Sequence, residues 1–224
     1  MNLNLNQRLV AIGMRLSGVD LILRKGDKIN TDIEKTILEA VLTINDDSSI
    51  ASLLFSWIKV HGNYVITEKL SKLTRGYHED KYPQIVWVHA IAAYAYENGM
   101  HKWNPLIKKY KQPQYLYPKK ISESAIQLKG AIPYLKKNGF FVPEGSIRIR
   151  EEDVLTPEEL IKKNLQYKNR YIFGVSWRAD IITMIQSGIK TPTEIAKLLG
   201  CSYEPAHRVF REYRMGNAQT ACMG

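Results

Sequence analysis

Polar and basic side chains gather in a short stretch near the end of the 224-residue chain. Arginine can hydrogen-bond to two acceptors of a guanine at once, and hydroxyl-bearing side chains donate to phosphate oxygens. Glutamate accepts from the amine of cytosine, so the stretch offers both donors and acceptors. We expect contacts with nucleic acid from Thr193, Ser202, Tyr203, Glu204, His207, Arg208, Arg211 and Arg214.

Two short helices joined by a glycine turn are predicted to position these side chains. Thr191 can cap the first helix, Pro192 suits its first turn, and Glu194 completes a capping-box pattern. Gly200 stands where a left-handed residue would end that helix, and the second helix is expected over Tyr203–Tyr213. Spacings of three and four give each helix an apolar face, made of Ile195, Ala196, Leu198 and Leu199 in the first and of Ala206, Val209, Phe210 and Tyr213 in the second.

A third helix is predicted upstream, over Trp177–Gln186. Together with this helix, two segments resemble the winged-helix family of bacterial and archaeal DNA-binding proteins. Their sequences are FGVSWRAD, Phe173–Asp180, and TPTEIAKLLGCSYEPAHRVFREY, Thr191–Tyr213. The resemblance covers roughly the last quarter of the chain and implies that Tyr203–Tyr213 is a recognition helix for the major groove. It also implies a two-stranded wing after that helix. Because Arg214–Gly224 has little β-forming content, we expect the wing to be short, absent or disordered.

Charge is distributed unevenly along the chain, which has a formal net charge of +10. Residues 101–140 hold nine lysines and one acid, Glu123, and residues 161–224 hold ten basic and four acidic side chains. Such regions favour a polyanionic partner. Auxiliary phosphate contacts, in place of those of a wing, are expected from Lys108, Lys109, Lys111, Lys119 and Lys120; a merely solvated surface is the alternative.

Tyrosines alternate with the lysines of residues 101–140. Stacked on unpaired bases, they would make this region an RNA or single-strand binder. The interpretation that we favour is that they pack inward. The tyrosines concerned are Tyr110, Tyr115, Tyr117 and Tyr134.

The sequence contains no recognised catalytic motif: no P-loop, dinucleotide fingerprint, nucleophile elbow or zinc motif. Cys201 and Cys222 offer neither a disulfide framework nor a metal cluster, and the histidines are scattered, with His89 expected to be a hydrogen-bonded core residue. We therefore expect no enzyme, no cofactor and no metal. The alternative is a metal-independent RNase that uses Arg75, His78 and the basic region.

The fold is predicted to be mainly α. Residues 1–118 are expected to form a helical bundle around Ile85–Tyr96, which is apolar almost all round. Residues 119–165 would connect it, through a β-hairpin at Phe140–Ile149, to a helix-turn-helix module at residues 166–224. Further helices are predicted at Thr31–Leu42, Ser48–Ile58, Thr67–Leu73 and Thr156–Tyr167, and an interrupted one within Leu3–Leu23.

These features together predict a sequence-specific double-stranded DNA-binding protein that regulates transcription. Small basic proteins of this layout resemble autoregulators of prokaryotic operons, including antitoxins and phage-defence regulators, which is an analogy only. A homodimer is expected from half-site geometry, and the bundle is available to a protein partner. With no signal segment and no apolar run of membrane-spanning length, we expect a cytoplasmic, nucleoid-associated protein without membrane contact. The alternatives are a protein-interaction module without DNA binding, and an RNA-binding protein or nuclease that uses residues 101–140.

Overall fold

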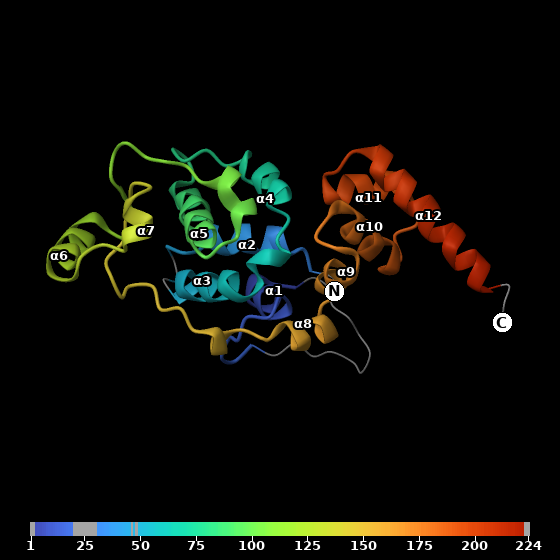
Figure 1. The fold of residues 1–224 in the computed structure, drawn as a ribbon, viewed down its shortest axis with the longest axis horizontal. Coiled ribbons are helices and arrows are strands. Elements are labelled where there is room, and N and C mark those ends of the chain that lie inside the picture. Colours follow the sequence, from blue (N-terminus) through green and yellow to red (C-terminus); the bar gives the residue numbers. More distant parts are fainter. Residues whose placement is uncertain (1–2, 20–30, 46, 48, 222–224) are drawn as a thin grey trace. The chain divides into compact units, whose positions relative to one another are not determined.

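The computed structural model describes residues 3–19, 31–45, 47 and 49–221, with side chains up to residue 216. The protein is mainly α-helical, as predicted (Figure 1). It divides into two compact units, residues 1–21 with 33–157 and residues 22–32 with 158–224. Each unit is treated by itself below. In the described part of the chain, no helix combines the length and apolar character needed to cross a bilayer.

The first unit begins with helices that the sequence predicts from their caps and apolar spacing. The Asn4 side chain accepts from the Gln7 N–H and so starts the first of them, within the stretch where an interrupted helix was expected. Positions 20–23 of that stretch lie outside the described residues. The helices are α1 (Leu5–Ala11), α2 (Ile33–Leu42), α3 (Ser49–His61), α4 (Thr67–Thr74) and α5 (Val86–Glu97).

Helix α5 lies at the centre of the first unit, which confirms the prediction made from its apolar character. Most of its residues are buried, and it contacts α2, α3 and α7 (Pro133–Lys136). Trp87 of α5 meets Phe55 of α3 edge-on, with ring centroids 6.4 Å apart. Two further buried indoles donate hydrogen bonds, Trp57 to the Ile12 carbonyl at 2.6 Å and Trp103 to the Gly62 carbonyl at 3.1 Å. The indole N–H groups of Trp57 and Trp103 are therefore satisfied although both side chains are buried.

A buried ion pair joins α2 to α4. The Lys69 Nζ lies 3.2 Å from Glu34 Oε2, and both side chains are almost fully removed from solvent. The other oxygen of Glu34 accepts from the Ile66 N–H at 2.8 Å. Each charge is compensated, which is the condition under which buried charges are tolerated.

The second half of the first unit contains a small parallel sheet. Strand β1 (Gln114–Tyr115) pairs with β2 (Phe140–Phe141), with Gln114 opposite Phe140. Helix α6 (Lys119–Lys129) and helix α7 lie between the strands in the sequence. Gly139 precedes β2 with φ +89, and its carbonyl accepts from the Gln114 N–H at 2.9 Å.

The β-hairpin predicted over Phe140–Ile149 is wrong. Only the first two residues form a strand, and they pair with β1 rather than with the following run. In that run the Arg148 N–H donates to Ser52 Oγ at 3.0 Å, and the Arg150 N–H donates to Ser56 Oγ at 2.9 Å. Serine hydroxyls of α3 thus accept hydrogen bonds from backbone N–H groups that would have paired across a hairpin.

The second unit consists of five helices within its described residues. The helix predicted over Thr156–Tyr167 is divided in two, because Asn164 caps a new helix by accepting from the Tyr167 N–H at 2.8 Å. The sequence assigned residues up to 165 to a connecting segment; in the structure this unit starts at residue 158. Its helices are α8 (Pro157–Lys163), α9 (Leu165–Phe173), α10 (Trp177–Gln186), α11 (Pro192–Leu199) and α12 (Tyr203–Ala221).

Candidate nucleic-acid interface

Helices α10, α11 and α12 pack around one apolar core (Figure 1). α12 contacts both α10 and α11. Leu198, expected on the inner face of α11, is 44% exposed instead. The core consists of Ile181, Ile182, Ile195, Leu199, Ala206, Val209 and Phe210, which includes most of the residues that the spacing predicted.

The turn between α11 and α12 has the local structure that the sequence predicts. Thr191 Oγ1 accepts from the Glu194 N–H at 3.3 Å at the start of α11. Gly200 ends that helix in the left-handed conformation, with φ 70 and ψ 26. The Gly200 and Cys201 N–H groups both donate to the Ala196 carbonyl. A left-handed residue costs glycine little, so the glycine is used where the chain must turn.

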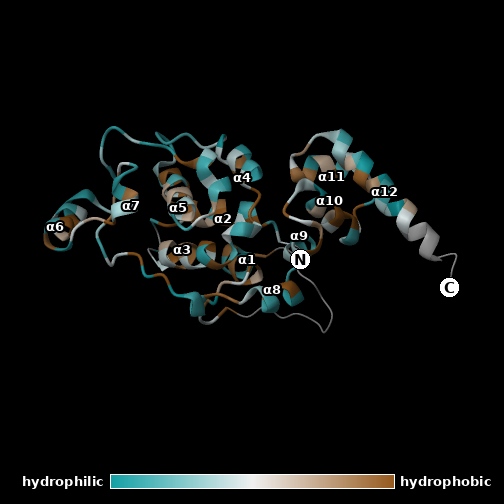
Figure 2. Cartoon of the chain, viewed as in Figure 1, coloured by the Kyte–Doolittle hydropathy of each residue, from teal (hydrophilic) through white to brown (hydrophobic). Residues whose placement is uncertain are grey.

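All eight side chains proposed to contact nucleic acid are exposed. Glu204, Arg208 and Arg211 recur at spacings of four and three along α12, which places them on one helix face. That face lies opposite the buried residues Ala206 and Val209. The alternation of hydrophilic and hydrophobic positions along α12 is visible in Figure 2. The outer face of α12 is therefore polar and carries arginines.

Two of the arginines among these residues contact other side chains of the second unit. Arg208 lies 3.6 Å from Glu204 in an exposed pair one helical turn apart. The Arg214 guanidinium lies 5.1 Å from the centroid of the Phe210 ring. Arg211 has no partner among the described side chains. Exposed pairs of this kind are weak, so they leave the arginines available to a stronger anion.

Residues 214–221 continue α12 as a helix. These are the residues in which a wing would begin, so in the described part of the chain the helix predicted over Tyr203–Tyr213 continues as helix and is not followed by strands. Positions 222–224 lie outside the described residues.

The lysines proposed for auxiliary phosphate contacts belong to the first unit, and all five are exposed. Lys108 is engaged, since its Nζ donates to Glu79 Oε1 at 2.6 Å. The tyrosines among the lysines pack on aromatic partners: Tyr110 on Phe140, Tyr115 on Phe141, Tyr117 on Trp87 and Tyr134 on Tyr94. All four side chains are half-buried, so the inward packing that the sequence interpretation favoured is found only in part.

A cluster of titratable residues that sequence spacing missed surrounds Glu79. Its Oε1 accepts from Lys108 and from the Tyr110 hydroxyl, each at 2.6 Å, and lies 3.7 Å from His89 Nε2. Burial acts to raise the pKa of Glu79, but the bonds from Lys108 and Tyr110 outweigh it and hold that pKa below its ordinary value. Burial together with the bond to Glu79 raises the pKa of the Tyr110 hydroxyl.

His89 is partly buried and hydrogen-bonded, with Nδ1 donating to the Leu106 carbonyl at 2.7 Å. This bond leaves Nε2 as the nitrogen that can accept a proton. Burial lowers the pKa of His89, so the ring is neutral near pH 7. Arg75 and His78, the residues of the RNase alternative, line a cavity of about 340 Å³ together with His89 and Lys108.

Within the described residues, no group of three or more His, Cys, Asp or Glu side chains has the arrangement of a metal site. Comparisons with protein-family models, with curated proteins and with solved structures find no match to this chain. The winged-helix resemblance therefore stays a prediction from the residues of α10–α12, and the chain is assigned to no family.

Proposed function

We propose that the protein binds double-stranded DNA in a sequence-specific manner, with α12 in the major groove, and that it regulates transcription. The observation that carries this proposal is the position of Arg208 and Arg211 on the polar face of α12, opposite its buried face. A helix of this kind, preceded by a short helix and a left-handed glycine turn, offers its first residues to base edges. The Arg208 and Arg211 side chains would contact guanine or phosphate, and Ser202, Tyr203, Glu204 and His207 lie toward the N-terminal end, where bases are read.

The surroundings of α12 support this proposal electrostatically. Residues 161–224 carry ten basic against four acidic side chains. One of those acids, Asp180, forms a buried ion pair with Arg170, so neither of these two residues contributes charge to the surface. Two more, Glu204 and Glu212, pair with Arg208 and Arg178. The second unit also contains Glu158 and Glu159, so from residue 158 onward ten basic side chains stand against six acidic ones. The net charge of this segment is positive, as a polyanion partner requires.

A homodimer and a role in operon autoregulation belong to the same proposal. Two copies would read two half-sites about one helical turn apart. The exposed apolar residues at the end of α9, Tyr171, Ile172 and Phe173, are the part of the second unit best suited to bury surface in such a dimer. Light scattering of the purified chain, with and without an operator duplex, measures this stoichiometry.

The experiment that tests duplex binding is selection of bound duplexes from a random library, followed by gel-shift titration of the selected sequence. The double variant Arg208→Ala, Arg211→Ala is expected to lose most affinity. Lys162→Ala with Lys163→Ala removes the same charge from exposed positions of α8 and is the matched control. Equal losses in both would mean that only net charge matters, and no enrichment of any sequence would favour a protein-interaction module.

A second candidate function, metal-independent RNA cleavage, is favoured by one observation. His89, His78, Arg75 and Lys108 line the same 340 Å³ cavity, and His89 Nε2 is placed to take a proton. RNA cleavage that persists in EDTA and is lost in His89→Ala would support it. Intact RNA after prolonged incubation with the wild-type chain would exclude RNA cleavage as a function.

A further inference from the structure

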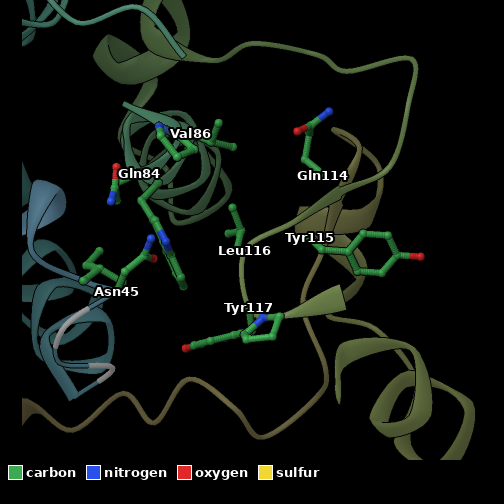
Figure 3. Close-up of a pocket in the computed structure, with 11 residues that line it drawn as sticks. Asn45, Gln84, Val86, Gln114, Tyr115, Leu116 and Tyr117 are labelled. Carbon is green, nitrogen blue, oxygen red and sulfur yellow. The ribbon is translucent and has the colours of Figure 1, made fainter. Parts of the chain in front are cut away.

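The first unit contains a second, larger cavity with a different chemistry. Its volume is about 520 Å³, within the range of small-molecule sites. Three segments far apart in the sequence form it: the end of the α2 region at residues 44–45, the entry to α5 at residues 83–87, and β1 with the residues after it, 114–118. Figure 3 shows Asn45 and Gln84 on one side of this space and Leu116 between them and Gln114.

The lining of this cavity is aromatic, aliphatic and amide-bearing. Trp87 and Leu116 are buried and form apolar surface, and Tyr117 lies edge-on to Trp87, with ring centroids 5.3 Å apart. Of the described residues that line the cavity, none is charged. Asn45, Gln84 and Gln114 contribute the side-chain amides. The occupant of such a space should be flat, largely apolar and uncharged, with hydrogen-bonding groups at its edge.

Two of the three amides are available to an occupant. Among the described residues, the side-chain amides of Asn45 and Gln84 have no hydrogen-bond partner. Each amide presents donors and an acceptor side by side. This is the pattern that asparagine and glutamine use to bind the edge of a nucleobase, which also presents adjacent donors and acceptors.

Positive charge stands beside the cavity. Pro118 forms part of its wall, and Lys119 and Lys120 follow directly in the first turn of α6. The Lys119 Nζ lies 5.8 Å from the ring centroid of Tyr115, another lining residue, whose ring points away from Leu116 (Figure 3). Glu123 lies 3.8 Å from Lys119 and offsets part of its charge, whereas the Lys120 ammonium has no partner among the described residues. A neutral sugar would make no use of these lysines, but the phosphate attached to a nucleoside would.

We propose that this cavity binds a nucleobase, with the adjoining phosphate held against Lys119 and Lys120. The base inserts between the amides of Asn45 and Gln84 and the apolar surface of Trp87 and Leu116. The nucleobase can come from a free nucleotide or from a single-stranded nucleic acid. This site belongs to the first unit and does not depend on duplex binding by α12.

The test uses the full chain and two kinds of probe. Nucleoside monophosphates are titrated by calorimetry, and labelled single-stranded oligonucleotides of about twelve nucleotides are titrated by fluorescence anisotropy. Binding of mononucleotides identifies a small-molecule site, and binding of strands alone identifies a strand-binding site; either supports the proposal. If neither probe binds, or if ribose 5-phosphate binds as tightly as a nucleoside monophosphate, the proposal is overturned.

Variants then locate the binding. Asn45→Leu with Gln84→Leu removes both free amides, and Gln127→Leu, at an exposed position of α6, is the control. Lys119→Ala with Lys120→Ala removes the charge beside the cavity, and Lys129→Ala with Lys136→Ala is its control. We expect each cavity variant to lose at least about tenfold in affinity, equivalent to about 1.4 kcal/mol, while the controls and Arg208→Ala, Arg211→Ala bind as the wild type does.

A measurement on the wild-type chain covers the case in which the amide variant does not fold. Bound nucleotide should slow hydrogen exchange at residues 83–88 and 114–117 and leave α12 unchanged. Unchanged exchange in both segments at saturating nucleotide, or wild-type affinity in a folded amide variant, contradicts the site. Loss of duplex binding with retained nucleotide binding would overturn only the proposal made for α12.

Discussion

The Arg170 guanidinium of α9 and the Asp180 carboxylate of α10 form a two-point ion pair in which both side chains are fully buried. Nε donates to Oδ1 and Nη2 donates to Oδ2, each at 2.8 Å. Gln166 donates a further bond to Oδ2 at 2.9 Å. The planar fork of arginine matches a carboxylate in this geometry, so the pair fixes how α9 lies on α10. Because α12 packs on α10, the pair also bears on the helix proposed to bind DNA.

Asp180→Ala is therefore expected to lower the stability of the second unit by about 3–5 kcal/mol, since it leaves the Arg170 charge buried without its carboxylate. Denaturant unfolding followed by hydrogen exchange in α9–α12 measures the loss. Arg178→Ala is the matched control, because it breaks an exposed pair with Glu212 and should cost less than about 1 kcal/mol. Similar small losses in both variants would show that the buried pair does not hold the helices together.

The burial of His61 predicts how the stability of the first unit depends on pH. Its side chain is fully buried, with Nε2 donating to the Leu155 carbonyl at 2.9 Å, and burial lowers its pKa from 6.5 to about 4. In the unfolded chain His61 thus takes up a proton near pH 6.5, whereas in the folded chain it does so only near pH 4. Stability is fully present above pH 6.5 and falls by up to about 3 kcal/mol as the pH drops to 4. His61→Gln should flatten this part of the pH profile, and the exposed His101→Gln should not; equal profiles in all three proteins would contradict it.

Replacing Gly139 by a residue with a side chain should lower the stability of the fold for two reasons. Its φ of +89 disfavours any side chain, and an added Cβ would lie 2.5 Å from the Tyr110 carbonyl oxygen. Gly139→Ala should therefore lower the free energy of unfolding by more than about 2 kcal/mol, because both strain and overlap oppose it. Gly145→Ala shares the positive φ, at +77, but an added Cβ there meets nothing within 4 Å. Thermal melts of both variants should separate the two effects, and equal losses would assign the whole cost to backbone strain.

Features that depend on neighbouring residues could be predicted from the sequence. The cap at Thr191, the left-handed Gly200 and the apolar face of α12 all arise within a few positions, and the structure confirms them. The central position of α5 follows from its apolar character alone.

Features that depend on distant residues could not be predicted in this way. Glu79, His89 and Lys108 meet only because α5 and the segment after it fold back on the α4–α5 loop. The predicted hairpin does not form, because the hydroxyls of Ser52 and Ser56, nearly a hundred positions earlier, accept hydrogen bonds from the backbone N–H groups of Arg148 and Arg150. Asn45, Gln84 and Gln114 likewise carry no local signal of the cavity that they share.

The salt dependence of duplex binding tests the central claim most directly. The selected duplex is titrated with the wild type, with Arg208→Ala, Arg211→Ala and with Lys162→Ala, Lys163→Ala between about 50 and 200 mM salt. If the two arginines of α12 contact phosphates, the slope of log K against log [salt] falls by up to about two for the α12 variant only. If they contact bases, affinity for the selected sequence falls toward that for unrelated duplexes with less change in slope. Wild-type affinity and slope in the α12 variant would contradict DNA recognition by this helix.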